Sequence, residues 1–381
     1  MNKYYLLAPG PTPVPPETLL AMARPAIHHR EPEFKPIFRD CREGLRYLFQ
    51  TDRDVVILAS SGTGAMEAAV TNFLRRGDKA LYVNGGKFGE RWGKILAAYG
   101  CEPVEVKVEW GRAVDPAAIR AALDADPAIR AVYVQASETS TAVRHPVEEI
   151  ARITAGRDDV ILVVDGITAV GVFPLPMDAT GIDVLVTGSQ KALMLPPGLA
   201  FIAWSAKADG FLETSDLPRF YFDLGAERKK QQDDQTAWTP AVSLVVGLQD
   251  VLRRIREETL EGVFARTSRL ARATRAAVQA MGLELFAPDS PSDACTAVEM
   301  PAGVDGVALK KVLRERFGIT VAGGQDQAKG KIIRIAHLGY ADTFDVITAV
   351  SALEMALAGL GHPVEMGAGV RAAQKVLGEA S

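Results

Sequence analysis

The chain has few cysteines, no basic run and no long apolar segment. Its three cysteines among 381 residues, Cys41, Cys101 and Cys295, are widely spaced and fit no metal-binding pattern, so we expect a reducing compartment and no metal site. The net charge of −4 argues against a nucleic-acid surface. No apolar run reaches the length of a membrane span. The N-terminal segment before Pro9-Gly10-Pro11 is too short for the apolar core of a signal peptide. No signal peptide is therefore expected, and the predicted location is cytoplasmic.

Two apolar segments of the sequence end abruptly in polar residues. Val160–Asp165 ends in a carboxylate, and Asp183–Lys191 ends in Ser189-Gln190-Lys191. Short β-branched runs without polar alternation predict strands buried on both faces, and ligands of such sheets lie beyond the carboxyl ends of the strands. An acid at one end and a lysine at the next suit pyridoxal phosphate, because the amine can form a Schiff base and the carboxylate can pair with the ring nitrogen. Either residue alone could be an ordinary strand-end residue meeting solvent.

A third element fits the phosphate of the same cofactor. The apolar strand Asp54–Ala59 runs into Ser60-Ser61-Gly62-Thr63-Gly64, and good helix formers follow. Small residues at a strand-to-helix turn let the backbone approach an anion, which the free N–H groups of the helix N-terminus attract. The turn lacks the Gly-Lys-Ser/Thr of a P-loop and the dinucleotide glycine pattern. An ordinary helix cap at Ser61 or Thr63 is the alternative interpretation.

The order of elements predicts an α/β fold. Strand and helix patterns alternate up to residue 204, which indicates a mostly parallel sheet covered by helices. The segment 103–108 alternates in polarity and is expected near an edge, while 199–204 follows its predecessor too closely for a parallel crossover. Residues 209–240 are expected to be loop-rich, and 283–286 is expected to be a strand. We divide the chain into an extended arm (1–15), a large domain (16–258) and a small α+β domain (259–381) that ends in an exposed helix.

The chain resembles the class V, fold-type I pyridoxal-phosphate enzymes, and more narrowly the alanine-glyoxylate and serine-glyoxylate (serine-pyruvate) aminotransferases. The resemblance covers essentially the whole chain. Gly188-Ser-Gln-Lys-Ala-Leu193 is its most specific piece, and the Pro9-Gly-Pro-Thr12 arm, Pro196-Pro-Gly198 and Lys331–Ile335 add to it.

The resemblance implies a role for each matching residue. Lys191 matches the Schiff-base lysine that shuttles a proton, and Asp165 the partner of the pyridine nitrogen. Arg334 matches the arginine that binds the substrate α-carboxylate, for which a planar guanidinium is suited. The remaining matches concern the cofactor: Phe88 and Ile167 on its two ring faces, Thr139 at the ring, Ser61, Gly62, Thr63 and Gln190 at the phosphate, and Thr236 and Thr239 at the phosphate of a neighbouring subunit in a homodimer.

The predicted function is transfer of an amino group from serine or alanine to glyoxylate or another small 2-oxo acid such as pyruvate, by a ping-pong Schiff-base mechanism. Ala142, where relatives often carry glycine, and Ser137 depart from the family pattern and concern specificity. A class V lyase such as a cysteine desulfurase is an alternative, but Gln190 stands where desulfurases place histidine, and Cys295 is the only candidate for their catalytic cysteine. A non-enzymatic phosphate- or nucleotide-binding protein is the other alternative.

Overall fold

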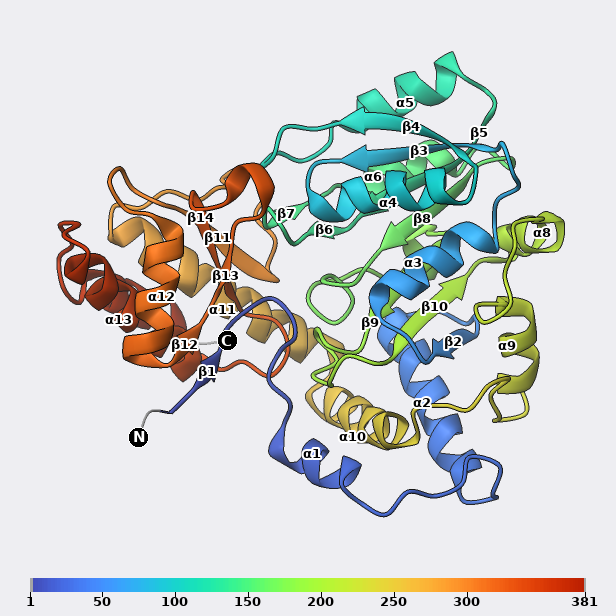
Figure 1. Ribbon diagram of the computed structural model, residues 1–381, viewed down its shortest axis with the longest axis horizontal. Coiled ribbons are helices and arrows are strands. Elements are labelled where there is room, and N and C mark those ends of the chain that lie inside the picture. Colours follow the sequence, from blue (N-terminus) through green and yellow to red (C-terminus); the bar gives the residue numbers. More distant parts are fainter. Residues whose placement is uncertain (1–2, 380–381) are drawn as a thin grey trace.

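The computed structural model describes residues 3–379, and a seven-stranded sheet forms its larger part (Figure 1). β10 runs antiparallel to both of its neighbours, β2 and β9, whereas the remaining pairs are parallel. The antiparallel prediction for this strand is therefore confirmed. In spatial order the strands are β2 (Val55–Leu58), β10 (Ala200–Trp204), β9 (Val184–Gly188), β8 (Ile161–Asp165), β5 (Ile129–Gln135), β3 (Lys79–Asn84) and β4 (Glu102–Lys107).

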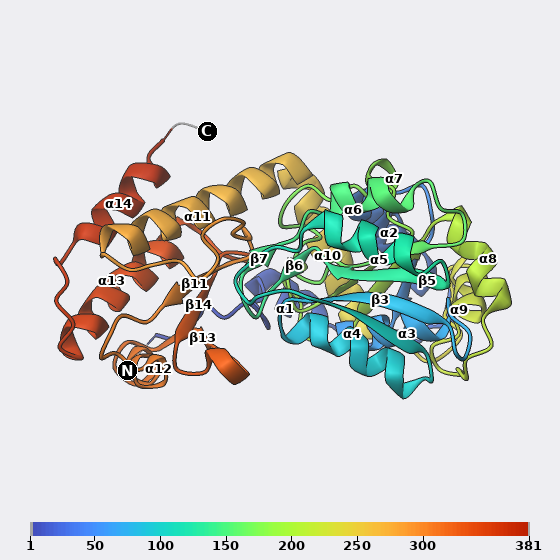
Figure 2. The same cartoon turned by 90° about the horizontal axis from the view of Figure 1, so that it is seen from above.

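Helices cover both faces of this sheet (Figure 2). Successive strand residues point to opposite faces, so that Val163 and Val164 of β8, for example, enter different apolar cores. One core is closed by α2 (Phe34–Phe49), α5 (Pro116–Ala125), α6 (Val147–Thr154) and α10 (Val242–Glu258). The other is closed by α3 (Gly62–Thr71), α4 (Lys87–Ala98), α8 (Ala206–Thr214) and α9 (Leu224–Gln231). The exposed, alternating β4 lies at the sheet edge, as predicted.

A third apolar core lies in the C-terminal part of the chain. A three-stranded antiparallel sheet orders β11 (Cys295–Glu299), β14 (Ile332–Ala336) and β13 (Ala322–Gly323). Its helices are α11 (Leu260–Ala280), α12 (Gly306–Phe317), α13 (Thr343–Gly359) and α14 (Ala368–Leu377), with a short 3-10 turn at Asp326–Ala328. α10 ends and α11 begins around Thr259, whose φ is +67°. The domain division at residue 258 stays a prediction.

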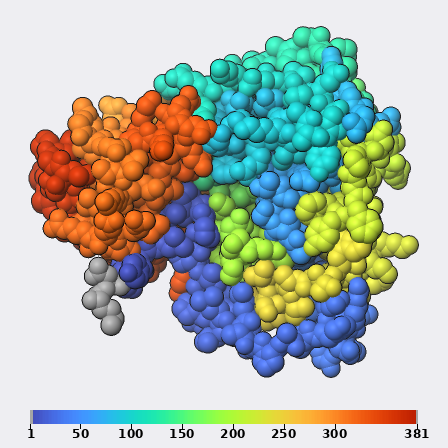
Figure 3. Space-filling model, viewed as in Figure 1, coloured from blue at the N-terminus to red at the C-terminus, as the bar shows by residue number. Residues whose placement is uncertain are grey.

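The N-terminal segment joins both parts. β1 (Tyr5–Leu6) pairs in parallel with β12 (Ile319–Thr320) of the C-terminal part. The chain then runs to α1 (Pro16–Met22), which packs against α10. Figure 3 shows these blue residues lying between the orange C-terminal part and the green part of the large sheet. The arm thus lies where the large part and the C-terminal part of the molecule meet.

Four local predictions differ from the structure. Residues 209–240 contain α9 and the greater part of α8, which lack strong apolar stripes but are capped by the side chains of Ser205 and Asp223. The consecutive prolines 15 and 16 predict a non-helical segment, but Pro16 begins α1, because a proline at the first helical position loses no intrahelical hydrogen bond. The expected strand 283–286 is reduced to one bridge, Leu285 to Val298. α14 packs on α11 and is not a freely exposed helix.

The shorter elements complete the description. α7 (Met177–Thr180) is one turn, and β6 (Ser137–Glu138) pairs with β7 (Val143–Arg144) in a small hairpin. Ala142, in its loop, adopts a φ of +60°, a conformation that glycine reaches without steric cost. This is the position where the family often carries glycine.

Candidate active site

Asp165 and Lys191 come from the ends of neighbouring parallel strands. Asp165 closes β8, and Lys191 follows the end of β9 by three residues. The Asp165 carboxylate is buried and accepts a hydrogen bond from the backbone N–H of Ile167 at 2.8 Å. Burial raises the pKa of Asp165 to about 7, while the nearby positive charges of Arg91 and Lys191 act in the opposite direction. The Asp165 carboxylate and the Lys191 amine are therefore both largely buried, and the charge of each affects the pKa of the other.

The Lys191 amine is held by the N-terminal arm. Its Nζ donates a hydrogen bond to the carbonyl oxygen of Pro9 at 2.6 Å. Burial lowers the pKa of the Lys191 amine to about 8, with the nearby Cys295 and Asp165 acting in the opposite direction. A larger fraction of this amine than of an exposed lysine is consequently neutral, and hence nucleophilic, near physiological pH.

The arm continues along Lys191 beyond Pro9. Thr12 donates hydrogen bonds from its N–H to the carbonyl of Gln190 and from its hydroxyl to the carbonyl of Lys191, at 3.1 and 2.8 Å. Gly10 has a φ of +130°, and a Cβ atom there would lie 2.1 Å from the Lys191 Nζ. Both the positive φ and the lack of space for a Cβ atom favour glycine at position 10. No local sequence signal places residues 9–12 at the lysine, since nearly 180 residues separate them.

Replacing Gly10 with alanine is expected to disturb the Lys191 amine as well as the backbone. We predict a loss of roughly 1–3 kcal/mol in unfolding free energy and at least about a tenfold loss of turnover, because misplacing a reacting group by an ångström is costly. Gly77→Ala is the matched control, since Gly77 has a φ of +82° but open space around it. Denaturant unfolding and steady-state kinetics are the measurements. Equal kinetics for the two variants would exclude this role of Gly10.

The turn between β2 and α3 has the features of an anion cradle. Ser61 is the N-cap of α3, and its side chain makes no capping hydrogen bond to the first turn. A Cβ on Gly62 would lie 2.5 Å from the Cδ1 atom of Ile167, and a Cβ on Gly188 would lie 3.4 Å from the Gly62 nitrogen. The turn therefore packs closely against the residues that follow Asp165 and precede Lys191, where a ligand could bridge them.

Gln190 completes this cradle. Its Oε1 atom is buried and has no hydrogen-bond partner among the residues the structure describes, although buried amides are normally paired. The same atom lies 3.0 Å from the position of a Cβ on Gly188. Because Oε1 can only accept a hydrogen bond, a phosphate would be bound by the NH₂ group of the Gln190 amide together with backbone N–H groups and hydroxyls, and Asp165 suits a protonated ring nitrogen. The residues present thus fit pyridoxal phosphate.

Phe88 is fixed at the start of α4 by a residue that the sequence analysis missed. The fully buried Glu138 carboxylate accepts hydrogen bonds from the N–H groups of Phe88 and Gly89, at 3.1 and 2.9 Å, and from Ser140. Burial raises the pKa of Glu138, and these hydrogen bonds oppose the shift. A single acid among the small residues 137–141 was the available signal. Glu138 caps α4 and thereby orients the aromatic ring.

Arg334 enters the same region from β14. Its Nη1 donates to the carbonyl of Thr139 at 2.7 Å, and its Nη2 and Nε donate to the carbonyl of Gly323 at 2.8 and 3.2 Å. The guanidinium is buried, and its positive charge is among the causes that lower the pKa of Lys191. Two backbone carbonyls from different segments thus orient a cation, whose remaining donors can bind a carboxylate.

Thr139 links these parts. Its carbonyl holds Arg334, and its hydroxyl lies 2.6 Å from the hydroxyl of Thr168. Thr168 was not predicted as a site residue, although it comes three residues after Asp165. The structure therefore brings together most residues predicted for the site.

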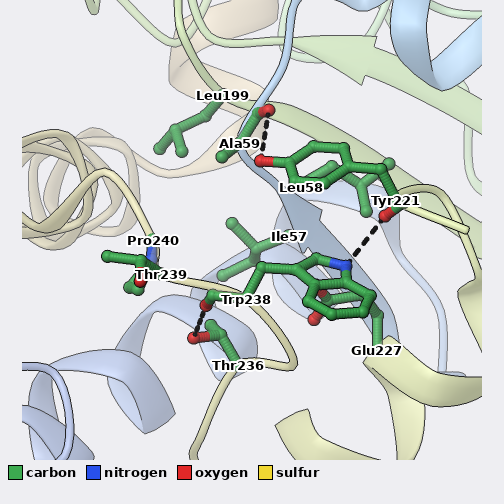
Figure 4. Close-up of a pocket in the computed structure, with 10 residues that line it drawn as sticks. All are labelled: Ile57, Leu58, Ala59, Leu199, Tyr221, Glu227, Thr236, Trp238, Thr239 and Pro240. Carbon is green, nitrogen blue, oxygen red and sulfur yellow. Dashed lines mark hydrogen bonds between the residues drawn. The ribbon is translucent and has the colours of Figure 1, made fainter.

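Thr236 and Thr239 lie in a separate small pocket (Figure 4). The Thr236 hydroxyl donates to the carbonyl of Trp238 at 2.6 Å, and the indole N–H of Trp238 donates to the carbonyl of Tyr221. Ala59, just before the phosphate turn, also lines this pocket. The described residues that line this pocket do not include Lys191, Asp165 or Arg334. Thr236 and Thr239 therefore line a pocket that Ser61, Gly62, Thr63 and Gln190 of the same chain do not line.

Residues 3–379 contain neither a candidate metal-binding cluster nor a membrane-spanning helix. No three His, Cys, Asp or Glu side chains are grouped so that they could hold a metal ion. No helix in this range is long and apolar enough to cross a membrane.

Comparison with known proteins identifies the family. The model of the family "Aminotransferase class-V" matches residues 4–347. The "Soluble hydrogenase, small subunit" of Synechococcus sp. is 44% identical over 383 residues, covering 100% of both chains. The L-aspartate–glyoxylate aminotransferase of Paracoccus denitrificans is 37% identical, over 97% of this chain and 95% of the relative. The serine–glyoxylate aminotransferase of Methylorubrum extorquens is 35% identical, over 99% and 97% of the two chains.

Solved structures agree. The ureidoglycine-glyoxylate aminotransferase of Bacillus subtilis superposes with a TM-score of 0.94 at 28% sequence identity, covering 99% of this chain and 98% of that chain. Its architecture confirms the predicted fold-type I class. The predicted roles of the individual site residues stay predictions.

Proposed function

Because this chain belongs to the class-V aminotransferase family, we propose that it transfers an amino group from serine or alanine to glyoxylate, or to another small 2-oxo acid such as pyruvate. The observation that carries this proposal is the meeting of Lys191, Asp165 and Arg334 in one buried site. An amine, an acid and a carboxylate receptor are the three groups that transamination of an α-amino acid needs. The three named aminotransferases above differ in their donor, but glyoxylate stands in the name of each.

Each residue of the site has a part in this proposal. When bound, pyridoxal phosphate supplies the aldehyde that carries the amino group and a ring that accepts electrons. Asp165 holds a proton at the ring nitrogen, and the Lys191 Nζ moves a proton to and from the substrate Cα. Arg334 orients the α-carboxylate by parallel hydrogen bonds. The remaining contacts would come from Phe88, Ile167 and Thr139 at the ring and from Ser61, Gly62, Thr63 and Gln190 at the phosphate.

A homodimer forms part of the proposal. Thr239 lies beside an aromatic cluster in which the exposed Phe220 packs against Trp238, with ring centroids 4.8 Å apart and the ring planes tilted by 35°. Exposed aromatic clusters are common at protein interfaces. In such a dimer, Thr236 and Thr239 would reach the phosphate of the neighbouring subunit.

The lyase alternative finds little support. Cys295 is buried within β11, and burial raises the pKa of its thiol to about 11. A desulfurase needs a reactive, accessible thiolate. The Cys295 thiol is instead buried, and its raised pKa favours the protonated form.

The test is a half-reaction screen. Purified protein loaded with pyridoxal phosphate is mixed with single amino acids, and loss of its visible absorbance is followed. We expect serine and alanine to discharge the band and glyoxylate to restore it. Release of sulfide from cysteine at a comparable rate, or indifference to serine and alanine with rapid reaction of aspartate, would contradict the proposed donors.

Binding of the cofactor should depend on pH through the Lys191 amine. The pKa of this amine is lowered to about 8, and only its neutral form is nucleophilic, so the initial rate at which apo-protein acquires the band should rise about tenfold per pH unit below 8 and level off above it. Stopped-flow absorbance from pH 6 to pH 10 measures this. A rate that keeps rising to pH 10 would mean an unperturbed lysine.

A further inference from the structure

Arg91 is a cation near the site to which no role has been given. It lies on α4 one turn after Phe88 and is half-buried. Its Nη1 donates a hydrogen bond to the hydroxyl of Thr63, in the first turn of α3, at 2.8 Å. Its guanidinium carbon lies 5.0 Å from the centre of the Phe88 ring. One side chain thus touches both the phosphate turn and the residue predicted to stack on the cofactor ring.

Most of the hydrogen-bonding capacity of Arg91 is still available. A guanidinium carries five N–H donors, and within residues 3–379 the bond to Thr63 is the one hydrogen bond that Arg91 makes. The neighbouring N-terminus of α3 adds N–H groups that the Ser61 side chain does not cap. A cation beside an uncapped helix N-terminus attracts an anion strongly.

Arg91 also belongs electrostatically to the catalytic centre. Its positive charge is among the causes that lower the pKa of Lys191 and that limit the rise in the pKa of Asp165. The Arg91 guanidinium is therefore close enough to Asp165 and Lys191 for its charge to act on both groups.

We propose that Arg91 is a further cofactor-binding residue, whose guanidinium binds the phosphate end of pyridoxal phosphate while its bond to Thr63 holds α4 against the phosphate turn. This rests on the proposed function. Arginine suits the task because its planar fork holds several N–H donors in fixed directions, so that it can bond a phosphate and a hydroxyl in a defined geometry, whereas the ammonium of lysine is a compact point charge.

The experiment compares two ligands that differ only in the phosphate. Apo-protein is titrated with pyridoxal phosphate and with pyridoxal, and the dissociation constants are read from the visible band. For Arg91→Gln we expect the affinity for pyridoxal phosphate to fall roughly 10- to 100-fold, with the affinity for pyridoxal unchanged. Lys94→Ala is the control, because Lys94 lies on the same helix, is exposed and pairs with Glu90. It should bind both ligands like the wild type.

Arg91→Lys gives a second, milder test that remains available if Arg91→Gln does not fold. It keeps the charge but loses the fork, so we expect a smaller loss, roughly 3- to 10-fold, again for pyridoxal phosphate alone. Equal losses for both ligands, or no loss for either, would overturn the role of Arg91. Wild-type protein that gains no band with pyridoxal phosphate would instead refute the proposed function itself.

Discussion

Lys191→Ala should reduce transamination by roughly 10⁴-fold or more, the scale seen when a covalent catalyst is removed. The amine is the group placed to react with the cofactor and to move a proton, and its position is set by the Pro9 carbonyl. The protein should still bind pyridoxal phosphate through its phosphate contacts, but without the band that borohydride abolishes. Absorbance spectra before and after reduction, with steady-state rates, are the measurements.

Two further variants make this result specific. Lys191→Arg keeps a positive charge but has no amine of suitable basicity, and it should be equally inactive. A small primary amine added to Lys191→Ala should restore part of the proton transfer. The unfolding midpoint should stay within a few degrees of the wild type, because removing a buried amine also removes its desolvation cost. Substantial activity in Lys191→Ala without added amine would remove Lys191 from the mechanism.

Arg334→Ala should lower kcat/KM for amino acids by about 2–4 kcal/mol of transition-state binding, or roughly 30- to 1000-fold. The bonds of Arg334 to Thr139 and Gly323 fix its guanidinium in a buried position, so a bound carboxylate meets donors that are already oriented. The visible band should be retained, because the predicted cofactor contacts come from other residues.

Substrate chemistry provides the control. Serine amide lacks the carboxylate, so the wild type should use it poorly and Arg334→Ala should treat serine and serine amide almost alike. Arg334→Lys should recover only part of the loss, because an ammonium cannot make two parallel hydrogen bonds. If Arg334→Ala lost activity toward both substrates in equal measure, the residue would be a structural support and not a carboxylate receptor.

The alternation of elements up to residue 204 was predictable because it depends on local patterns. The buried strands consist of β-branched runs, and short connections leave few topologies. This logic placed Asp165 and Lys191 at neighbouring strand ends and made β10 antiparallel. It failed for α8 and α9, whose stability comes from capping and from contacts that no apolar stripe announces. The roles of Lys191 and Asp165 were inferred from the strand ends and supported by the family resemblance, whereas the role of Arg334 came from the resemblance.

The sequence by itself determined the fold class and the chemical types at the strand ends, because strand formation and the turn before α3 follow from side chains near one another in the chain. Only the tertiary structure decided that Pro9 holds the Lys191 amine, that Glu138 fixes Phe88, that Thr139 orients Arg334 and that Arg91 reaches Thr63. These contacts join segments 28 to 195 residues apart. Their geometry arises when the large sheet with its helices, the C-terminal part and the N-terminal arm pack together, and no local pattern records that packing.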